Sequence, residues 1–271
     1  MFKGFYTAAS GMLTQQRKTE MLTNNVANST TPGFKEDRSS IRTFPELLQT
    51  SVSKSFSGTT KKADVGSLAT GVYMQEAIPN FVQGDMKETE LKTDMALIDG
   101  NVPGDENNKN GSIFFNVQSA DGEMHYTRNG NFTLNDQGFL TTSEGYNVLD
   151  DNNNAIQLSN ENFTVSDNGV VTDSNGEAFR LGVSYTENPQ ALIKEGNGLY
   201  RQPEGEELES AYGAEGVDFQ IKQGYLETSN VDVSKSMTEM MTAYRSFEAN
   251  QKILQAYDQS MEKAANEIGK I

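Results

Sequence analysis

Few side chains in this sequence could carry out catalytic chemistry. Cysteine is absent, which excludes thiol catalysis, disulfides and cysteine-ligated metals. His125 is the single histidine, so a serine–histidine–aspartate mechanism would rest on it alone. It stands in the alternating segment EMHYTR, which is typical of a strand, and we interpret it as an ordinary strand residue. The sequence contains no P-loop, HExxH, GxSxG or post-strand GxGxxG motif.

One carboxylate pattern resembles a calcium loop. In DDNNNAIQLSNE (150–161), positions 1, 3, 5 and 12 of an EF-hand loop are occupied by Asp150, Asn152, Asn154 and Glu161. Position 6 requires glycine for a sharp turn and is alanine here, and the flanks are strand-like. We therefore interpret the segment as a polar hairpin turn and leave calcium as an open alternative. The sequence predicts no catalytic residue, no cofactor and no metal site.

The acidic residues gather in the middle of the chain, whose net charge is −16. Residues 63–230 contain 28 acidic and eight basic side chains, whereas the two ends are nearly balanced. Nucleic-acid binding needs a cationic surface, so we expect no nucleic-acid partner. No apolar run approaches the ~18 residues of a membrane span. The N-terminus lacks the apolar centre of a cleavable signal peptide. We expect neither membrane insertion nor a cleaved leader.

A long amphipathic helix is predicted over residues 231–268. Every seventh residue forms an apolar row: Val233, Met240, Phe247, Leu254, Met261 and Ile268. A second row is less uniform: Met237, Tyr244, Gln251, Asp258 and Ala265. Alternating steps of four and three residues are typical of a coiled-coil or bundle helix. Ser229 or Asn230 is the predicted N-cap.

The N-terminus carries a weaker version of the same pattern. One side of the predicted helix contains Phe5, Ala9, Met12 and Val26 with the polar Gln16, Thr19 and Thr23, and Leu13 and Leu22 lie alongside. The helix is predicted to end near Asn28, before Pro32-Gly33. Two amphipathic helices packed on a globular core are the plain interpretation. The polar members of both patterns favour helices that need partner helices to be stable.

Between the helices, short apolar runs alternate with Asn-Gly and Asp-Gly pairs, which favour hairpin turns. The strands predicted from this pattern are 112–118, 123–127, 131–134, 139–141, 146–149, 163–166, 170–172 and 178–185. Residues 50–62 and 203–216 are expected to be loops or extended connections. We expect an α+β fold, with a central antiparallel β domain flanked by terminal helices that pair as a coiled-coil-like layer. The expected domains are a helical, coiled-coil domain (1–30 and 229–271), an extended connecting region with short strands (31–90 and 200–228) and a β-rich outer domain (91–199).

Both ends resemble the signatures of bacterial flagellar rod and hook proteins. The N-terminal segment GMLTQQRKTEMLTNNVANSTTPGFK is similar to the family's helix that ends in Asn-Asn-x-Ala-Asn. The C-terminal segment QGYLETSNVDV, followed by YRSFEAN, is similar to the family's second signature. A third block, DMALIDG with YTRNGNFTLNDQGFL, resembles the central module of the distal rod type. Residues 101–112 depart from the family pattern, which runs directly from Ile-Asp-Gly into a Gly-Phe-Phe strand.

The resemblance implies a non-enzymatic subunit of the basal-body rod in the bacterial cell envelope. Such a subunit would be exported by the flagellar type III apparatus and would polymerise through its terminal helices into the axial tube that transmits torque. Its expected partners are copies of itself, other rod and hook proteins, and the export apparatus. Two alternatives stay open: a cell-wall glycan hydrolase that uses the acidic β domain, and a surface adhesin with a helical stalk.

The expected assembly interface combines the helical patterns with the two junctions. Its N-terminal members are Phe5, Ala9, Met12, Leu13, Leu22, Asn24, Asn25, Val26, Asn28 and Phe34. Its C-terminal members are Leu226, Ser229, Asn230, Val231, Val233, Met237, Met240, Tyr244, Phe247, Asn250, Leu254, Met261 and Ile268. In NNVANSTTPGF, we expect the amides to satisfy helix-end carbonyls and to bond across subunits, while Pro32-Gly33 redirects the chain and Phe34 packs beneath.

Overall fold

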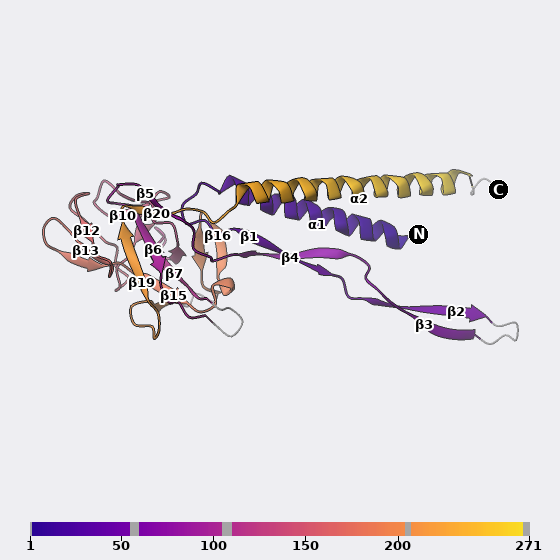
Figure 1. The fold of residues 1–271 in the computed structure, drawn as a ribbon, viewed down its shortest axis with the longest axis horizontal. Helices are drawn as coiled ribbons and strands as arrows, with labels where there is room; N and C mark the ends of the chain where they lie inside the picture. Colours follow the sequence, from indigo (N-terminus) through magenta and orange to yellow (C-terminus); the bar gives the residue numbers. More distant parts are fainter. Residues whose placement is uncertain (1, 55–59, 105–109, 204–206, 268–271) are drawn as a thin grey trace. The chain divides into compact units, whose positions relative to one another are not determined.

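The computed structural model of this chain describes residues 2–54, 60–104, 110–203 and 207–267. Ile268 and part of the 101–112 segment lie outside the described residues. A helix stands at each end of this range, and the strands between them pair antiparallel wherever a register is defined (Figure 1). The predicted α+β class is confirmed. The chain forms a helical unit (Met1–Ala27, Asp37–Ile78 and Asp232–Ile271) and a β-rich unit (Asn28–Glu36 and Pro79–Val231).

The helical unit contains both helices and two pairs of strands. Its elements are α1 (Phe2–Ala27), β1 (Asp37–Thr43), β2 (Leu47–Lys54), β3 (Thr60–Leu68), β4 (Val72–Pro79) and α2 (Val233–Glu267). Strand β1 pairs with β4, and β2 pairs antiparallel with β3 through an irregularity between Gln49 and Thr50. Residues 50–62, predicted as loops or extended connections, include parts of β2 and β3. The serines, threonines and lysines of this segment give no apolar period from which a strand could be predicted.

Helix α1 ends at Ala27, one residue before the predicted position. Helix α2 begins at Val233, but its cap differs from the prediction. Asp232 Oδ1 accepts the backbone N–H of Lys235 at 2.9 Å, so Asp232 is the N-cap, and Ser229 and Asn230 are not. Asn230 instead accepts the N–H of Glu36 at 2.7 Å and donates to the carbonyl of Asn80. The side chain of Asn230 is engaged in these long-range hydrogen bonds and is therefore not used to cap the helix.

The β-rich unit contains the remaining strands, with one short 3-10 helix (Pro189–Ala191). The strands are β5 (Met86–Glu88), β6 (Met95–Asp99), β7 (Ser112–Gln118), β8 (Met124–Thr127), β9 (Phe132–Leu134), β10 (Leu140–Thr142), β11 (Asn147–Val148), β12 (Thr164–Val165), β13 (Val170–Thr172), β14 (Ala178–Arg180), β15 (Val183–Thr186), β16 (Ile193–Gly196), β17 (Leu199–Arg201), β18 (Glu209–Ser210), β19 (Phe219–Gln223) and β20 (Tyr225–Glu227).

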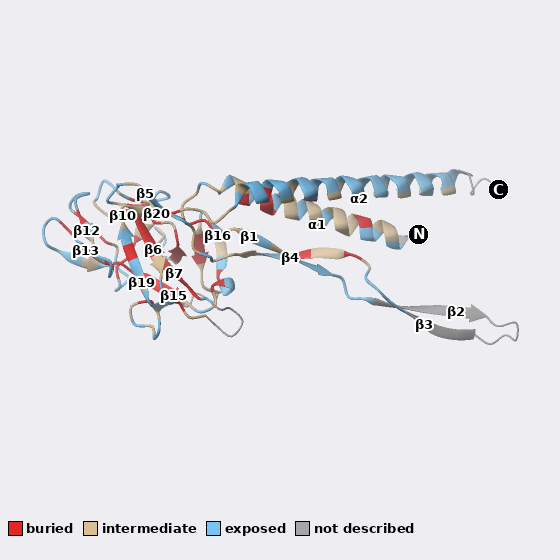
Figure 2. Ribbon diagram, viewed as in Figure 1, coloured by how far each residue is buried: buried red, intermediate tan, exposed pale blue. Residues whose placement is uncertain are grey.

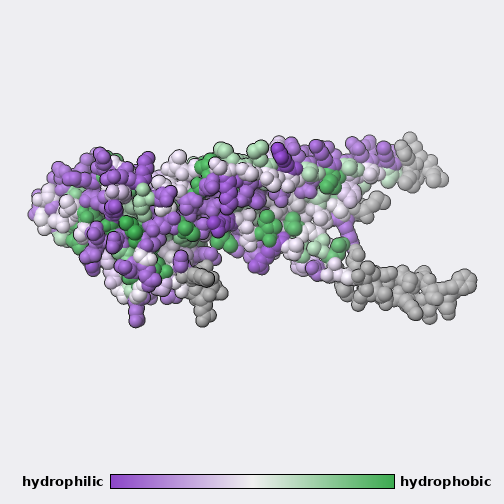
Figure 3. Space-filling view, viewed as in Figure 1, coloured by the Kyte–Doolittle hydropathy of each residue, from purple (hydrophilic) through white to green (hydrophobic). Residues whose placement is uncertain are grey.

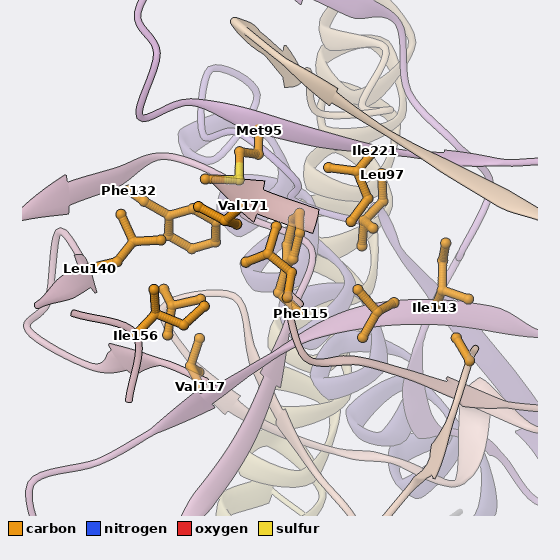
Figure 4. Close-up of a cluster of buried hydrophobic side chains, with 14 of the residues drawn as sticks. Met95, Leu97, Ile113, Phe115, Val117, Phe132, Leu140, Ile156, Val171 and Ile221 are labelled. Atoms are coloured by element: carbon orange, nitrogen blue, oxygen red, sulfur yellow. The ribbon is translucent and has the colours of Figure 1, made fainter. Parts of the chain in front are cut away.

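A nine-stranded sheet dominates this unit, and its order is β16-β17-β8-β7-β11-β10-β9, with β15 also paired to β7 and β18 paired to β15. Strands β12, β13 and β14 form a smaller sheet, and β19 and β20 pair with β6 and β5. The core gathers residues from several of these strands, among them Met95, Phe115, Phe132 and Ile221 (Figure 4). The Phe115 and Phe132 rings meet edge to face at a centroid distance of 5.2 Å. This apolar core holds the unit together.

Candidate functional site

Helices α1 and α2 pack against each other in opposite directions within the helical unit. Near the start of α1, a Cβ added at Gly4 would lie 2.0 Å from Tyr257 Oη, and one at Gly11 would lie 3.0 Å from Asn250 Nδ2. Further along α1, Lys18 Nζ lies 3.3 Å from Glu239 Oε2. The absence of side chains at the two glycines thus lets α2 approach closely. Small residues therefore determine how closely the two helices pack, whereas the sequence pattern had emphasised large residues.

The second predicted row of α2 does not face α1. Met237 and Tyr244 are 48% and 56% exposed, whereas Ser236 and Ala243 are almost fully buried. Ser236 and Ala243 belong to a row of every seventh residue that continues with the half-buried Asn250 and Tyr257. Each member of this row lies one position before a member of the predicted second row. A count of apolar residues overlooks such a row because Ser236 and Asn250 are polar. The first row, Val233, Met240, Phe247, Leu254 and Met261, is half-buried.

The other side of α1 is tied to the strands of the same unit. Thr7 Oγ1 donates to the carbonyl of Thr70 at 2.8 Å, and Thr14 Oγ1 donates to that of Val72 at 3.1 Å. Met21, Leu22 and Met74 form a small core against which Met240 packs. Thr7 and Thr14 therefore bind the backbone at the start of β4. The polar residues of the predicted pattern do not: Gln16 and Thr19 bond within α1, and Thr23 bonds within α1 and to Met240. Helix α1 consequently has defined neighbours on two sides.

The remaining predicted residues of α1 have mixed positions. Phe5, Ala9, Met12 and Val26 are half-buried, Leu22 is buried, and Leu13 and Asn24 are exposed. Asn25 is fully buried, since its Nδ2 donates to the Asp37 carbonyl at 2.8 Å and its Oδ1 accepts the Asp37 N–H at 3.0 Å. This amide joins the end of α1 to the start of β1 inside one chain. Contacts of these residues across subunits stay a prediction.

In the β-rich unit, four charged side chains form a network in which three are buried and the fourth, Asp99, is half-buried. Glu227 receives Lys35 Nζ and the Gly84 N–H (2.9 Å) on Oε1, and Arg128 Nε (3.0 Å) on Oε2. Arg128 also donates to both carboxylate oxygens of Asp99, at 2.8 and 3.0 Å. The side chains of Lys35, Arg128 and Glu227 are each 1% exposed. The network fastens the segment after α1 to the strand that leads towards α2.

The charges of this network perturb one another. Burial alone would raise the pKa of Glu227, but the positive charges of Arg128 and Lys35 outweigh burial and lower it. Burial, aided by repulsion from Arg128, lowers the pKa of Lys35 to about 8. Burial would lower the pKa of Arg128, but the carboxylates of Glu227 and Asp99 raise it. Sequence inspection missed this network. Its members stand in the signature blocks TTPGFK, IDG, YTRNG and GYLE. Each block is otherwise composed mainly of apolar or turn-forming residues, and the charged residue in it was the feature that could have indicated the network.

Replacing Lys35 by methionine is expected to change how stability depends on pH. The pKa of Lys35 is about 8 in the folded chain and 10.5 in an exposed lysine. Between these values the unfolded chain binds more protons at this position, so the free energy of unfolding rises with pH, by at most about 3 kcal/mol. Lys35→Met should lack this rise. Urea unfolding from pH 7.5 to 10.5 measures it, with Lys87→Met, at an exposed lysine, as the matched control. A constant difference between Lys35→Met and the unmodified chain would contradict the assignment.

The other predicted junction residues lie within the β-rich unit. Phe34 is buried, and Lys194 Nζ stands 4.4 Å above its ring centroid. Leu226 is buried in β20, and Ser229, Asn230 and Val231 are half-buried. Gly33 adopts a φ of 68° and donates its N–H to the Glu227 carbonyl at 2.8 Å. The Gly33–Glu227 hydrogen bond joins the two predicted signature segments, whereas Phe34 contacts Lys194 outside both.

The residues first considered for chemistry have structural surroundings. His125 is buried in β8, with its Nδ1 3.1 Å from Glu195 Oε2 and its ring against Tyr146. Asp150 Oδ1 accepts the N–H groups of Asn152 and Asn154 at 2.9 and 2.7 Å, which closes a turn. Glu161 is exposed. Among the residues the structure describes, no three histidine, aspartate or glutamate side chains are grouped to hold a metal ion.

Within the described ranges, neither helix has the length and apolar content that crossing a bilayer requires.

Three family models match separate parts of the chain. Residues 5–35 match the flagella basal body rod protein model, and residues 110–173 match the flagellar hook protein FlgE/F/G D1 domain. Residues 222–267 match the C-terminal model of the flagellar basal body rod FlgEFG proteins. The first and last matches cover α1 with its following junction and β20 with α2. They therefore include the helix pair and two members of the charged network, Lys35 and Glu227, and the middle match includes Arg128.

Relatives align along the full chain. The flagellar hook-basal body complex protein FlhO of Bacillus subtilis is 48% identical over 272 residues, covering 100% of both chains. The flagellar basal-body rod protein FlgG of Borreliella burgdorferi is 30% identical and covers 98% of both. FlgF of Caulobacter vibrioides is also 30% identical, with 100% of both chains covered. The chain therefore belongs to the flagellar basal-body rod protein family, whose members are structural components of the basal body and not enzymes.

Proposed function

We propose that the chain is a subunit of the distal section of the flagellar rod and polymerises through its terminal helices into the torque-transmitting axial tube. The observation that carries this proposal is the exposure of α2. Of its 35 residues, only Ser236 and Ala243 are buried among those whose side chains are described, and most of the helix surface faces solvent (Figure 2). Helices in proteins gain most of their stability from packing an amphipathic face. A helix this long and this exposed is suited to contacts with further subunits.

The proposal includes specific binding partners and a route of export from the cell. Its partners are further copies of this chain, other rod proteins, the hook, and the flagellar type III apparatus that would export it without a cleaved signal. The nearly balanced charge of both terminal segments supports lateral contacts, because strong like charge there would oppose assembly. A contact between two different surfaces of neighbouring subunits produces an open helix when the rotation between neighbours does not close a ring.

Electron microscopy of basal bodies from a strain that lacks this gene tests the proposal. We expect truncated rods without hooks, and restoration of both by the intact gene. A gene that stops before α2 is the matched control and should fail to restore them, because α1 then lacks its partner helix. Complete rods and hooks in the deletion strain would refute a required role in the axial structure.

A further inference from the structure

The helical unit contains an open apolar groove. It has a volume of about 540 Å³, and its lining comes from α1, the end of β1 and the segment before β4: Lys3, Tyr6, Ala9, Ser10, Leu13, Phe44 and Thr70. Its large apolar side chains are 40–65% exposed. The space-filling view likewise shows apolar side chains at the surface of the helical unit (Figure 3). Burying such a surface would be favourable, at ~25 cal/mol per Å².

Helix α2 carries an exposed apolar stripe of its own. Met237, Met241 and Tyr244 are 48–59% exposed. Their spacing of four and three residues places them on one face of the helix. This face differs from the one that Ser236 and Ala243 bury against the helical unit. The same chain thus presents an apolar groove and an apolar ridge on separate surfaces.

We propose that the α2 stripe of one copy packs into the α1 groove of a second copy. This inference rests on the proposed function and specifies which surfaces meet. The two features match in length, since Tyr6 and Leu13 are seven residues apart and so are Met237 and Tyr244, which corresponds to ~10 Å along a helix. A helical ridge of apolar side chains is the occupant that an elongated groove of this kind accepts.

Charge sets the direction of the contact. Lys3 is exposed at the end of the groove beyond Tyr6, and Glu248 is exposed one turn beyond Tyr244. Placing Glu248 near Lys3 brings Tyr244 towards Tyr6 and Met237 towards Leu13. The incoming α2 then runs opposite to the α1 that it covers, and therefore parallel to that copy's own α2. All copies point the same way, and the contact joins two different surfaces, so it can repeat without closing.

The absence of cysteine from the sequence makes this pairing directly testable. Full-length Leu13→Cys and Met237→Cys chains are expressed together in the deletion strain, and isolated basal bodies are treated with a short bis-maleimide linker. Each chain carries one thiol, so a bond between the two variants joins different copies. Lys235→Cys replaces Met237→Cys as the matched control, because two residues of helix rotate the thiol by ~200° to the opposite face. All three positions are exposed, so we expect the variants to preserve the fold.

We expect at least a tenfold higher yield of mixed dimer with Met237→Cys than with Lys235→Cys. Tyr6→Cys should pair with Tyr244→Cys and should pair poorly with Met237→Cys. Equal yields for the two faces of α2, or preferential linkage of Tyr6→Cys to Met237→Cys, would overturn the proposed contact. Unlinked chains in basal bodies that contain the protein would overturn the contact and leave the proposed function in place. Basal bodies that lack the protein would overturn both.

Discussion

Glu227→Gln is expected to lower the free energy of unfolding of the β-rich unit by about 3–5 kcal/mol, the usual cost of breaking a buried ion pair from one side. Lys35 and Arg128 both donate to this carboxylate, and their side chains are 1% exposed. Glutamine has the same shape but no charge, and its amide hydrogens would face one of the two cations. The one carboxylate left in the network would be that of Asp99, which pairs with Arg128 and is 20% exposed. Lys35 would then have no carboxylate partner in the network.

Thermal unfolding followed by near-ultraviolet circular dichroism of the tyrosines measures this effect. A loss of this size should lower the midpoint of the β-rich unit by roughly 6–20 °C. Glu88→Gln is the matched control, because Glu88 is an exposed carboxylate on the paired strand β5, and it should shift the midpoint little. Similar midpoints for Glu227→Gln and Glu88→Gln would show that the network contributes little to stability.

Gly33→Ala is the second substitution with a large expected effect. Gly33 has a φ of 68°, and a Cβ there would lie 2.5 Å from the backbone carbonyl carbon of Arg128. Alanine at this position would therefore have an unfavourable φ, which costs ~1–2 kcal/mol. Its Cβ would also clash with the backbone of Arg128. We expect a total loss above about 3 kcal/mol, because the backbone of Arg128 is held by the charged network.

Gly122→Ala separates the two causes. Gly122 has a φ of 88°, but no atom lies within 4 Å of an added Cβ. This control should show the cost of the positive φ alone. Urea unfolding of both variants gives the comparison, and the close approach accounts for the excess in Gly33→Ala. Equal losses for the two variants would show that the backbone around Gly33 yields easily.

Much of the fold follows from local patterns in the sequence. The predicted strands 112–118 and 170–172 coincide with β7 and β13, where apolar runs are bounded by turn residues. The predicted strand 178–185 is divided into β14 and β15. Gly182 lies at this break, and a Cβ there would lie 2.6 Å from the Asp150 carbonyl oxygen. Such a close backbone approach depends on distant residues, so a local pattern does not reveal it.

The candidate site was less accessible to prediction. The large residues at every seventh position of α2 indicated a buried face, but Ser236 and Ala243 mark where the helix is most buried. Small residues permit close approach and leave no apolar signal. The charged network was missed for a different reason. Lys35, Arg128 and Glu227 are far apart in sequence, and only the tertiary fold shows that they neutralise one another.

The hydrogen bond between Glu36 and Asn230 affects the entropy of forming the helix pair. The helices stand at opposite ends of the sequence, and closing a flexible loop of roughly 200 residues costs on the order of 4–5 kcal/mol. Once the β-rich unit has folded, Glu36 N–H lies 2.7 Å from Asn230 Oδ1, and only short segments connect this pair to Ala27 and Val233. The folded unit thus raises the effective concentration of each helix for the other. Helix pairing becomes a nearly local event.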